Sequence, residues 1–388
     1  MRIRNSAGFG SFVFGLGVSI AMLATVPGVA AEETKSAAGP NAEKLKVVRA
    51  KAVSFLKTTQ KDDGSWTMAN APGISGLIVT GLLRSGVPAD DPVAAAGLKY
   101  LAGFVQPDGG IYYTKSNHRN YETSIAVLAF TEANKDGKYK SLLAAADKYR
   151  RQQQGDEEEG KSKDDPYYGG AGYGSTSRPD MSNTQFLLEA LKAAGAKSDD
   201  PAFQKALIFV SRTQNLESEH NTTPFAAKVN DGGFYYTPAA GGATRAEGEA
   251  LPNGGLRSYA SMTYAGLKSM IYCGVGPDDP RVKAAVSWLK KHYSVTENPG
   301  AGQNGLYYYY QTFAKSLHAV GIAEFTDDAG KKHDWRNELT AQLAQVQQEN
   351  GSWVNPTARW NEGDPNLATA YALLALSYCD KQLEPAKK

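Results

Sequence analysis

Hydrophobic and polar positions along this chain form two kinds of helical stretch. Residues 52–56 and 285–289 lie in stretches that carry lysine, arginine or glutamine on one face, whereas residues 123–130 and 369–376 are apolar on nearly all sides. A helix that is apolar all round must be buried all round, while an amphipathic helix keeps one face in water. The pattern therefore predicts helix pairs, with an amphipathic outer member and an apolar inner member.

A short turn signature separates the two helices of a pair. Three copies read Gln-x-x-x-Gly-x-aromatic, and weaker copies follow at 168–173, 231–235 and 304–307. One unit that recurs six times, at spacings of about 45 to 75 residues, indicates a repeat fold. The residues of the three clear copies are Gln60, Gly64 and Trp66; Gln106, Gly110 and Tyr112; and Gln347, Gly351 and Trp353.

The loops between repeats and the ends of the array support two further predictions, the starts of the outer helices and the closure of the ring. Asp-Asp-Pro precedes an outer helix at 90–92, 199–201 and 278–280, where proline suits the first helical turn and aspartate suits its positive end. An open solenoid needs polar capping repeats, and the sequence has none. We therefore expect an all-α fold, a closed (α/α)6 toroid over residues 43–382, with an open arc as the alternative.

The N-terminal residues predict export. Arg2 and Arg4 precede an uncharged apolar run from 9 to 26 and a small-residue site that ends at Ala31. This pattern is typical of a secretory signal over 1–31, followed by a flexible leader over 32–42; a retained anchor is the alternative. Residues 383–388 are expected to form a disordered tail. The expected location is secreted or periplasmic, without a transmembrane anchor in the mature chain.

Charge and cysteine content exclude several functions. Removal of 1–31 takes two of the 42 basic residues and leaves 40 basic against 40 acidic, so no nucleic-acid partner is expected. Cys273 and Cys379 fall in non-adjacent repeats and are expected to be separate buried thiols rather than a disulfide. Two cysteines cannot build a zinc site, and we expect no metal and no cofactor.

The repeated turn resembles the QW-type repeat of squalene–hopene and other triterpene cyclases, and the Gly-Gly-aromatic turns are similar to those in the β-subunits of protein prenyltransferases. The likeness covers roughly residues 45 to 380. It implies the α/α toroid and a central cavity for an isoprenoid. It also implies that each glutamine caps helix-end amides while it stacks on the aromatic ring.

The resemblance also points to a candidate acid. In the cyclases an Asp-x-Asp-Asp-Thr motif protonates an alkene, and the best match here opens an inner helix at Asp180, with Asn183 and Thr184 after it. Ser182 and Asn183 replace two carboxyls, and neither a hydroxyl nor an amide is an acid strong enough for that step. Asp180 and Asn183 are the candidate catalytic residues of a degenerate motif, and an active enzyme would be terpene-cyclase-like.

Aromatic and polar residues gather where the turns meet the inner helices, which is the end at which a pocket would open. Tyrosine faces suit stacking on a flat or chain-like ligand, or stabilisation of a cation. The structural alternatives are packing for the tyrosines, helix capping for the carboxylates and a core hydrogen bond for the histidine. The candidate cavity-mouth residues are Tyr121, Glu122, Arg257, Tyr259, Tyr309, Tyr310, His318 and Asp364.

Three functions remain open at this point. An isoprenoid or triterpene enzyme requires a dry, apolar, closed central cavity. A non-catalytic binding or scaffold protein would hold a hydrophobic or chain-like small molecule at an open, tyrosine-rich mouth above a filled centre. A carbohydrate-active enzyme, the third function, requires two carboxyls that face each other across about 5 to 10 Å.

Overall fold

The computed structural model describes residues 39–174, 177–248 and 250–380, so the expected signal sequence and C-terminal tail lie outside the described residues. Twelve helices of eleven residues or more dominate it. The outer helices are α1 (Ala42–Thr58), α3 (Pro92–Ala102), α5 (Lys140–Arg151), α7 (Pro201–Arg212), α10 (Pro280–Lys291) and α12 (Trp335–Val346). The inner helices are α2 (Pro72–Arg84), α4 (Arg119–Ala133), α6 (Met181–Ala193), α9 (Ala260–Tyr272), α11 (Leu306–Val320) and α13 (Pro365–Leu376).

Four small elements lie in the connections: α8 (Ala226–Val229), a 3-10 turn η1 (Arg359–Asn361), and the antiparallel strands β1 (Phe325–Thr326) and β2 (Lys332–His333). Every residue of α9 is buried, whereas α5 buries only Ala146, Tyr149 and Arg150. The apolar helices therefore form the inner layer and the amphipathic helices the outer layer, as their sequence patterns predict.

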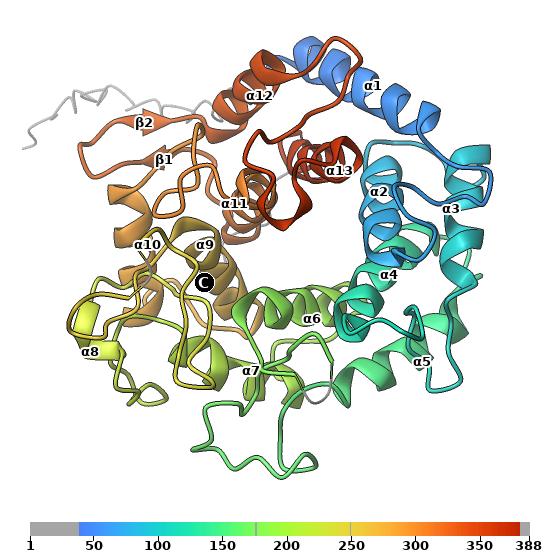
Figure 1. Cartoon of the computed structure of the whole chain (residues 1–388). Coiled ribbons are helices and arrows are strands. Elements are labelled where there is room, and N and C mark those ends of the chain that lie inside the picture. The colour runs from blue at the N-terminus through green and yellow to red at the C-terminus, as the bar shows by residue number, and fades with distance from the viewer. Residues whose placement is uncertain (1–38, 175–176, 249, 381–388) are drawn as a thin grey trace, which may run out of the picture. The chain divides into compact units, whose positions relative to one another are not determined.

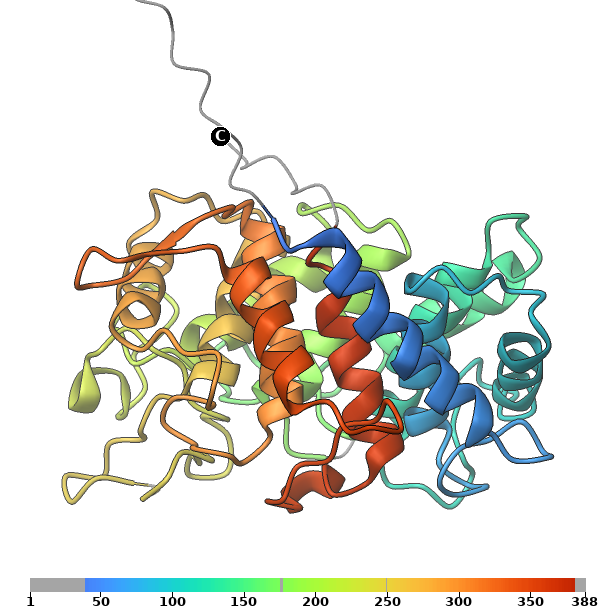
Figure 2. The same cartoon turned by 90° about the horizontal axis from the view of Figure 1, so that it is seen from above.

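The inner helices form a closed ring (Figure 1). Each inner helix packs against the next one along the chain, and α13 packs back against α2. The first outer helix, α1, contacts both α12 and α13, and Figure 2 shows it beside them. The predicted all-α toroid is confirmed, and the open arc is excluded because the last repeat contacts the first.

The turn glutamine joins neighbouring repeats through carbonyl groups. Gln60 Nε2 donates to the Gly64 carbonyl in its own turn (3.1 Å) and to the Val93 carbonyl at the start of α3 (2.9 Å). Gln347 Nε2 donates in the same way to Gly351 (2.9 Å) and to Val48 in α1 (3.0 Å). The expected capping of helix-end amides is replaced by donation to carbonyls, and the last glutamine fastens the last repeat to the first.

The second turn copy aligns one residue earlier than the sequence suggests. Gly109, rather than Gly110, has the left-handed φ of 88° that corresponds to φ 90° at Gly351. A Cβ on Gly109 would lie 2.7 Å from the Ala145 carbonyl oxygen of α5, so glycine is required there for close packing as well as for its conformation. Two consecutive glycines made the register ambiguous in the sequence.

The same shift applies to the aromatic position of that copy. The Ile111 N–H donates to Thr123 Oγ1 at 3.0 Å, as the Trp353 N–H donates to Thr369 Oγ1 at 3.1 Å. Ile111 is therefore the structural counterpart of the buried tryptophan. Tyr112 instead donates through its hydroxyl to Asp108 (2.6 Å).

Two further turn glutamines are hidden by insertions. Gln154 Nε2 donates to the carbonyls of Gly169 and of Ala202 in α7, each at 2.9 Å, although fourteen residues separate the glutamine from the glycine. Gln214 makes the equivalent pair of bonds to Gly232 and to the start of α10. Because the loop is inserted inside the motif, the linear pattern is lost while its hydrogen bonds persist.

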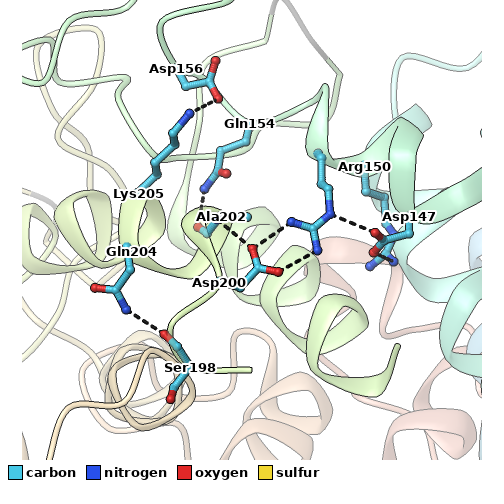
Figure 3. Close-up of polar contacts among 10 residues, drawn as sticks. Asp147, Arg150, Gln154, Asp156, Ser198, Asp200, Ala202, Gln204 and Lys205 are labelled. Carbon is cyan, nitrogen blue, oxygen red and sulfur yellow. Dashed lines mark hydrogen bonds and ion pairs between the residues drawn. The ribbon is translucent and has the colours of Figure 1, made fainter. Parts of the chain in front are cut away.

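Ion pairs fasten the first of these insertions to the outer layer (Figure 3). Asp156 in the inserted loop pairs with Lys205 of α7 at 2.7 Å. Arg151 at the end of α5 makes two bonds to Asp200, the capping residue of α7, at 2.7 and 2.9 Å. The inserted loop is thus held against α7.

Both cysteines are buried free thiols, as expected. Burial raises the pKa of Cys379 to about 12, and burial also raises the pKa of Cys273. Both thiols are therefore protonated at neutral pH. Within the described residues, none of the helices has the length and hydrophobicity needed to cross a bilayer.

Gly351 lies at the seam, the contact between the last repeat and the first, and its substitution tests whether the ring is closed. Gly351 and Gly86 share φ 90°, but a Cβ on Gly351 would lie 2.4 Å from the Lys51 carbonyl oxygen, whereas a Cβ on Gly86 would meet nothing within 4 Å. We predict that Gly86→Ala lowers the free energy of unfolding by about 1–2 kcal/mol through conformational strain alone. Gly351→Ala should cost about 1–3 kcal/mol more, because the backbone of α1 must shift. Urea denaturation measures both, and equal losses would refute this account of the seam.

Candidate functional site

A cavity of about 700 Å³ opens at the end of the ring where the turns meet the inner helices. All six inner helices contribute lining residues from their first two turns. The mouth is therefore formed by residues far apart in sequence that occupy similar positions in successive repeats. Its tyrosines are Tyr113, Tyr121, Tyr173, Tyr236, Tyr259, Tyr308 and Tyr371.

Four of the sequence-predicted site residues line this cavity: Asp180, Glu122, Tyr121 and Tyr259. The others lie elsewhere. Tyr309 and Tyr310 donate their hydroxyls to the carbonyls of residues 294 and 295, at 2.6 and 2.9 Å.

The remaining candidates also lie outside the cavity lining. Asp364 caps α13 by accepting from the Asn366 N–H at 2.8 Å. His318 lies in the last turn of α11, with its ring 5.2 Å from that of Tyr378. Arg257 is exposed in the loop before α9. For Asp364 the structural alternative, helix capping, describes the contact observed, whereas the contact observed for His318 is with the Tyr378 ring.

Asp180 is the buried carboxyl of the mouth. It precedes α6 as the N-cap residue: Oδ1 accepts from the Asn183 N–H (2.8 Å) and Oδ2 accepts from the Asn183 side-chain amide (2.7 Å). Only 1% of Asp180 is exposed, and this burial raises its pKa to about 6, although the Asn183 bonds, Tyr236 and Arg178 oppose the rise. Asp180 therefore changes protonation near neutral pH, as a general acid must.

Three arginines surround the mouth without carboxylate partners among the described residues. The guanidinium groups of Arg178 and Arg245 lie 5.8 and 5.0 Å from the centroid of the Tyr236 ring. The Arg359 guanidinium lies 4.6 Å from the Trp360 ring. Arg245 and Arg359 also oppose the burial-driven rise in the pKa of Tyr259. The mouth thus presents positive charge held on aromatic faces.

Two further carboxyls line the cavity, but their own loops engage them. Glu122 accepts from the Tyr113 N–H (3.0 Å) and from Ser116 Oγ (2.6 Å). Glu362 accepts from the Tyr308 N–H at 2.8 Å and from the Asn355 side-chain amide at 2.8 Å, so it caps α11. Burial raises the pKa of both glutamates. Asp180 is engaged by the backbone and side chain of Asn183, and a side-chain hydrogen bond with Tyr236 also lowers its pKa.

The cavity floor is a layer of tyrosine hydroxyls. Tyr121 and Tyr371 are joined through their hydroxyls at 3.1 Å, and Tyr308 contacts Ser182 Oγ at 3.0 Å. Gln185 Nε2 also donates to the Tyr308 hydroxyl at 3.0 Å. A hydroxyl that accepts this bond keeps its own proton available for donation, so Tyr308 can offer a hydrogen bond to an acceptor in the cavity.

Charged side chains fill the lumen behind that floor. Lys268 of α9 donates to the side-chain amide oxygen of Gln185 and pairs with Glu189 of α6, which also pairs with Lys315 of α11. Burial alone would raise the pKa of Glu189, but the two lysines lower it to about 2; burial lowers the pKa of Lys268 to about 8. The lumen here is polar and occupied, which differs from the dry apolar tube required for an isoprenoid chain.

Sequence reasoning did not select several residues of the mouth: Arg178, Arg245, Trp360, Glu362 and Tyr371. Arg178 stands two residues before Asp180, and this proximity was an available signal. The others lie on separate loops or within an apolar helix, where nothing local marks them. No group of three or more histidine, cysteine, aspartate or glutamate side chains among residues 39–174, 177–248 and 250–380 could hold a metal ion.

No protein-family model and no curated protein matches this chain. Solved structures do match. A polysaccharide lyase (TM-score 0.52, 10% identity) and an unsaturated glucuronyl hydrolase specific for heparin (TM-score 0.52, 13% identity) each cover 87% of this chain and 96% of their own. The type II terpene cyclase MstE from Scytonema has a TM-score of 0.49 at 13% identity and covers 87% of this chain and 97% of its own. The likeness to the lyase and the hydrolase supports the α/α toroid fold and assigns no reaction.

The buried acid makes stability depend on pH. The pKa of Asp180 is raised from 3.8 to about 6, so its contribution to stability is complete below pH 4 and falls as pH rises towards and through 6. Asp180→Asn should therefore gain up to about 3 kcal/mol relative to the parent between pH 4 and pH 7. Urea denaturation of both proteins across this range measures the difference.

Asp200→Asn is the matched control, because Asp200 also caps a helix but its pKa is lowered by a hydrogen bond from Arg151. Its carboxylate stabilises the fold above pH 3.8 and loses that effect only at lower pH. The Asp200 variant should therefore be less stable than the parent above about pH 4, and this difference should shrink only below about pH 4. Parallel pH curves for the parent and Asp180→Asn would contradict the buried-acid assignment.

Proposed function

We propose that this chain is a carbohydrate-active α/α-toroid enzyme that binds the end of an acidic oligosaccharide in the mouth cavity and uses Asp180 as a general acid. Asp180 gives its proton to the oxygen of the scissile glycosidic bond as the C–O bond breaks. Water adds its hydroxyl to the sugar carbon, and its released proton returns to the Asp180 carboxylate. The cycle consumes one water molecule and regenerates the acid. Glu122 and Glu362, which line the same cavity, are the candidates for the second carboxyl that this reaction requires.

The arginines carry the assignment of an acidic ligand. Arg178 and Arg245 come from two separate loops and line the cavity, and neither forms a salt bridge with a carboxylate in the described part of the chain. Guanidinium groups form bidentate hydrogen bonds with carboxylates and sulfates. Guanidinium groups without a salt-bridge partner at a cavity therefore favour an anionic ligand. Tyrosine faces and hydroxyls around them suit the alternating C–H and O–H groups of a sugar ring.

Two observations support Asp180 as the acid. Its carboxyl is almost fully buried, yet it lines the cavity, and its pKa of about 6 keeps part of the population protonated at neutral pH. The heparin-specific hydrolase and the polysaccharide lyase also act on polysaccharides within this fold, although a likeness this distant concerns the fold alone.

The isoprenoid alternative has weaker support. The repeat turns resemble those of the triterpene cyclases, but Glu189, Lys268 and Lys315 occupy the lumen in which a long hydrocarbon would lie. Burial of an apolar chain against these charges would leave them desolvated without hydrogen bonds from the ligand. A non-catalytic binding protein is the remaining alternative, which differs only in the absence of turnover.

Export through the segment at 1–31 stays part of the proposal, since it would place the chain with extracellular glycans.

The first test is a ligand panel for the mature protein. We expect galacturonate oligomers of two to six residues to raise the melting temperature, and neutral cello-oligosaccharides, squalene and polyprenols to have no effect. Product analysis by mass spectrometry should show cleavage by the parent and a loss of at least about 100-fold in Asp180→Asn, since general acid catalysis contributes at least that factor. Cleavage at the parent rate in Asp180→Asn would remove the acid role, and a shift with polyprenols alone would replace the substrate class.

Charge recognition is tested separately. Arg178→Met and Arg245→Met should each weaken galacturonate binding by roughly tenfold, because a charge-assisted hydrogen bond contributes about 1.5–3 kcal/mol. Their binding should also depend less on salt. Arg257→Met is the matched control, because Arg257 is exposed in the same region but does not line the cavity. Calorimetric titration at 20 and 200 mM salt measures both effects, and equal losses in all three variants would contradict the assignment.

A further inference from the structure

Exposed apolar side chains gather at the rim of the cavity. Six large hydrophobic residues are exposed in the described parts of the chain, and three of them, Met68, Tyr173 and Trp360, line this one cavity. Single exposed hydrophobic residues are common, but a cluster beside a pocket marks a contact surface. Trp360 is the largest of the three and is 44% exposed.

The backbone holds Trp360 in an unfavourable conformation. Its φ of 56° and ψ of 33° are left-handed, and the next residue, Asn361, also has a positive φ of 65°. The left-handed conformation of a residue with a Cβ destabilises the fold by about 1–2 kcal/mol. The position of this indole at the rim therefore lowers the stability of the fold. The ring is exposed and is not part of the hydrophobic core.

Two contacts hold the Trp360 ring in place. Gly305 leaves room for the ring, since a Cβ there would lie 2.8 Å from Trp360 Cζ3. Arg359, which is exposed, lies over the ring at 4.6 Å from its centroid. Asn355 anchors the loop by donating to the Gln303 carbonyl at 2.7 Å and to Glu362 at 2.8 Å. The indole of Trp360 and the guanidinium of Arg359 are therefore held together at the edge of the cavity.

We infer that Trp360 and Arg359 form a second binding subsite, which holds the sugar residue next to the one in the cavity. This inference rests on the proposed function. The indole supplies an apolar surface for the C–H face of the sugar, and the guanidinium pairs with its carboxylate. A ligand of one residue reaches only the cavity, whereas a ligand of two or more also reaches the rim. The subsite therefore selects for chain length and for a charge on the second residue.

The test compares ligand lengths. Trp360→Gly removes the indole and suits the left-handed backbone, so its melting temperature should not fall below the parent's. Arg359→Met removes the charge and keeps the stem. We expect each variant to bind tetragalacturonate roughly tenfold more weakly than the parent and to bind galacturonic acid as tightly as the parent. Arg359→Met should also reduce the salt dependence for the tetramer alone.

Two controls separate the possible outcomes. Val346→Ala removes an exposed apolar side chain that does not line the cavity, and should leave both affinities unchanged. If the parent binds tetragalacturonate and the rim variants bind it equally well, the subsite is refuted while the proposed function stands. If the parent binds neither galacturonic acid nor its tetramer, the acidic-sugar function itself is refuted. Equal weakening for both ligand lengths would place Trp360 and Arg359 in the cavity site and overturn the length-selective subsite.

Discussion

The fold depends on one recurring contact, the turn carboxamide that bridges its own turn and the next outer helix. Gln347 makes this contact across the seam to Val48, more than 290 residues away in sequence. A hydrogen bond that is exposed to water contributes little to the free energy of folding. These bonds satisfy carbonyl groups that packing has removed from water, and a buried carbonyl without a partner would destabilise the fold. A left-handed glycine beside it lets the turn approach the helix backbone. The last turn makes the same pair of bonds as the turns at Gln60, Gln154 and Gln214, and this contact joins the last repeat to the first.

Closure of the ring determines where chemistry can occur. All inner helices begin at the same end, so their first residues converge, and helix starts favour groups that accept from free N–H donors. Asp180 and Glu362 satisfy such donors, and both face the cavity. The same position that stabilises a helix therefore also supplies carboxyls to the mouth. Burial raises the pKa of both groups, to about 6 for Asp180.

The buried charges in the lumen limit the depth of the site. Glu189 lies between Lys268 and Lys315, and Lys268 also fixes the orientation of Gln185 beneath Tyr308. Removal of one partner would leave a buried charge uncompensated, which is far more costly than the pair itself is stabilising. This network keeps the lumen filled with protein side chains. Ligand chemistry is thereby restricted to the mouth and its rim.

The sequence by itself determined the repeat, the inner and outer layers and the toroid, because local periodicity and turn chemistry are short-range properties that recur. It also identified Asp180, Glu122, Tyr121 and Tyr259, which stand near the starts of inner helices. Only the tertiary structure decided that Gln154 and Gln214 complete interrupted turns, since their glycines follow long insertions. It alone brought Arg178, Arg245 and Trp360 together, because their loops become neighbours only when the ring closes and no local pattern encodes that distance.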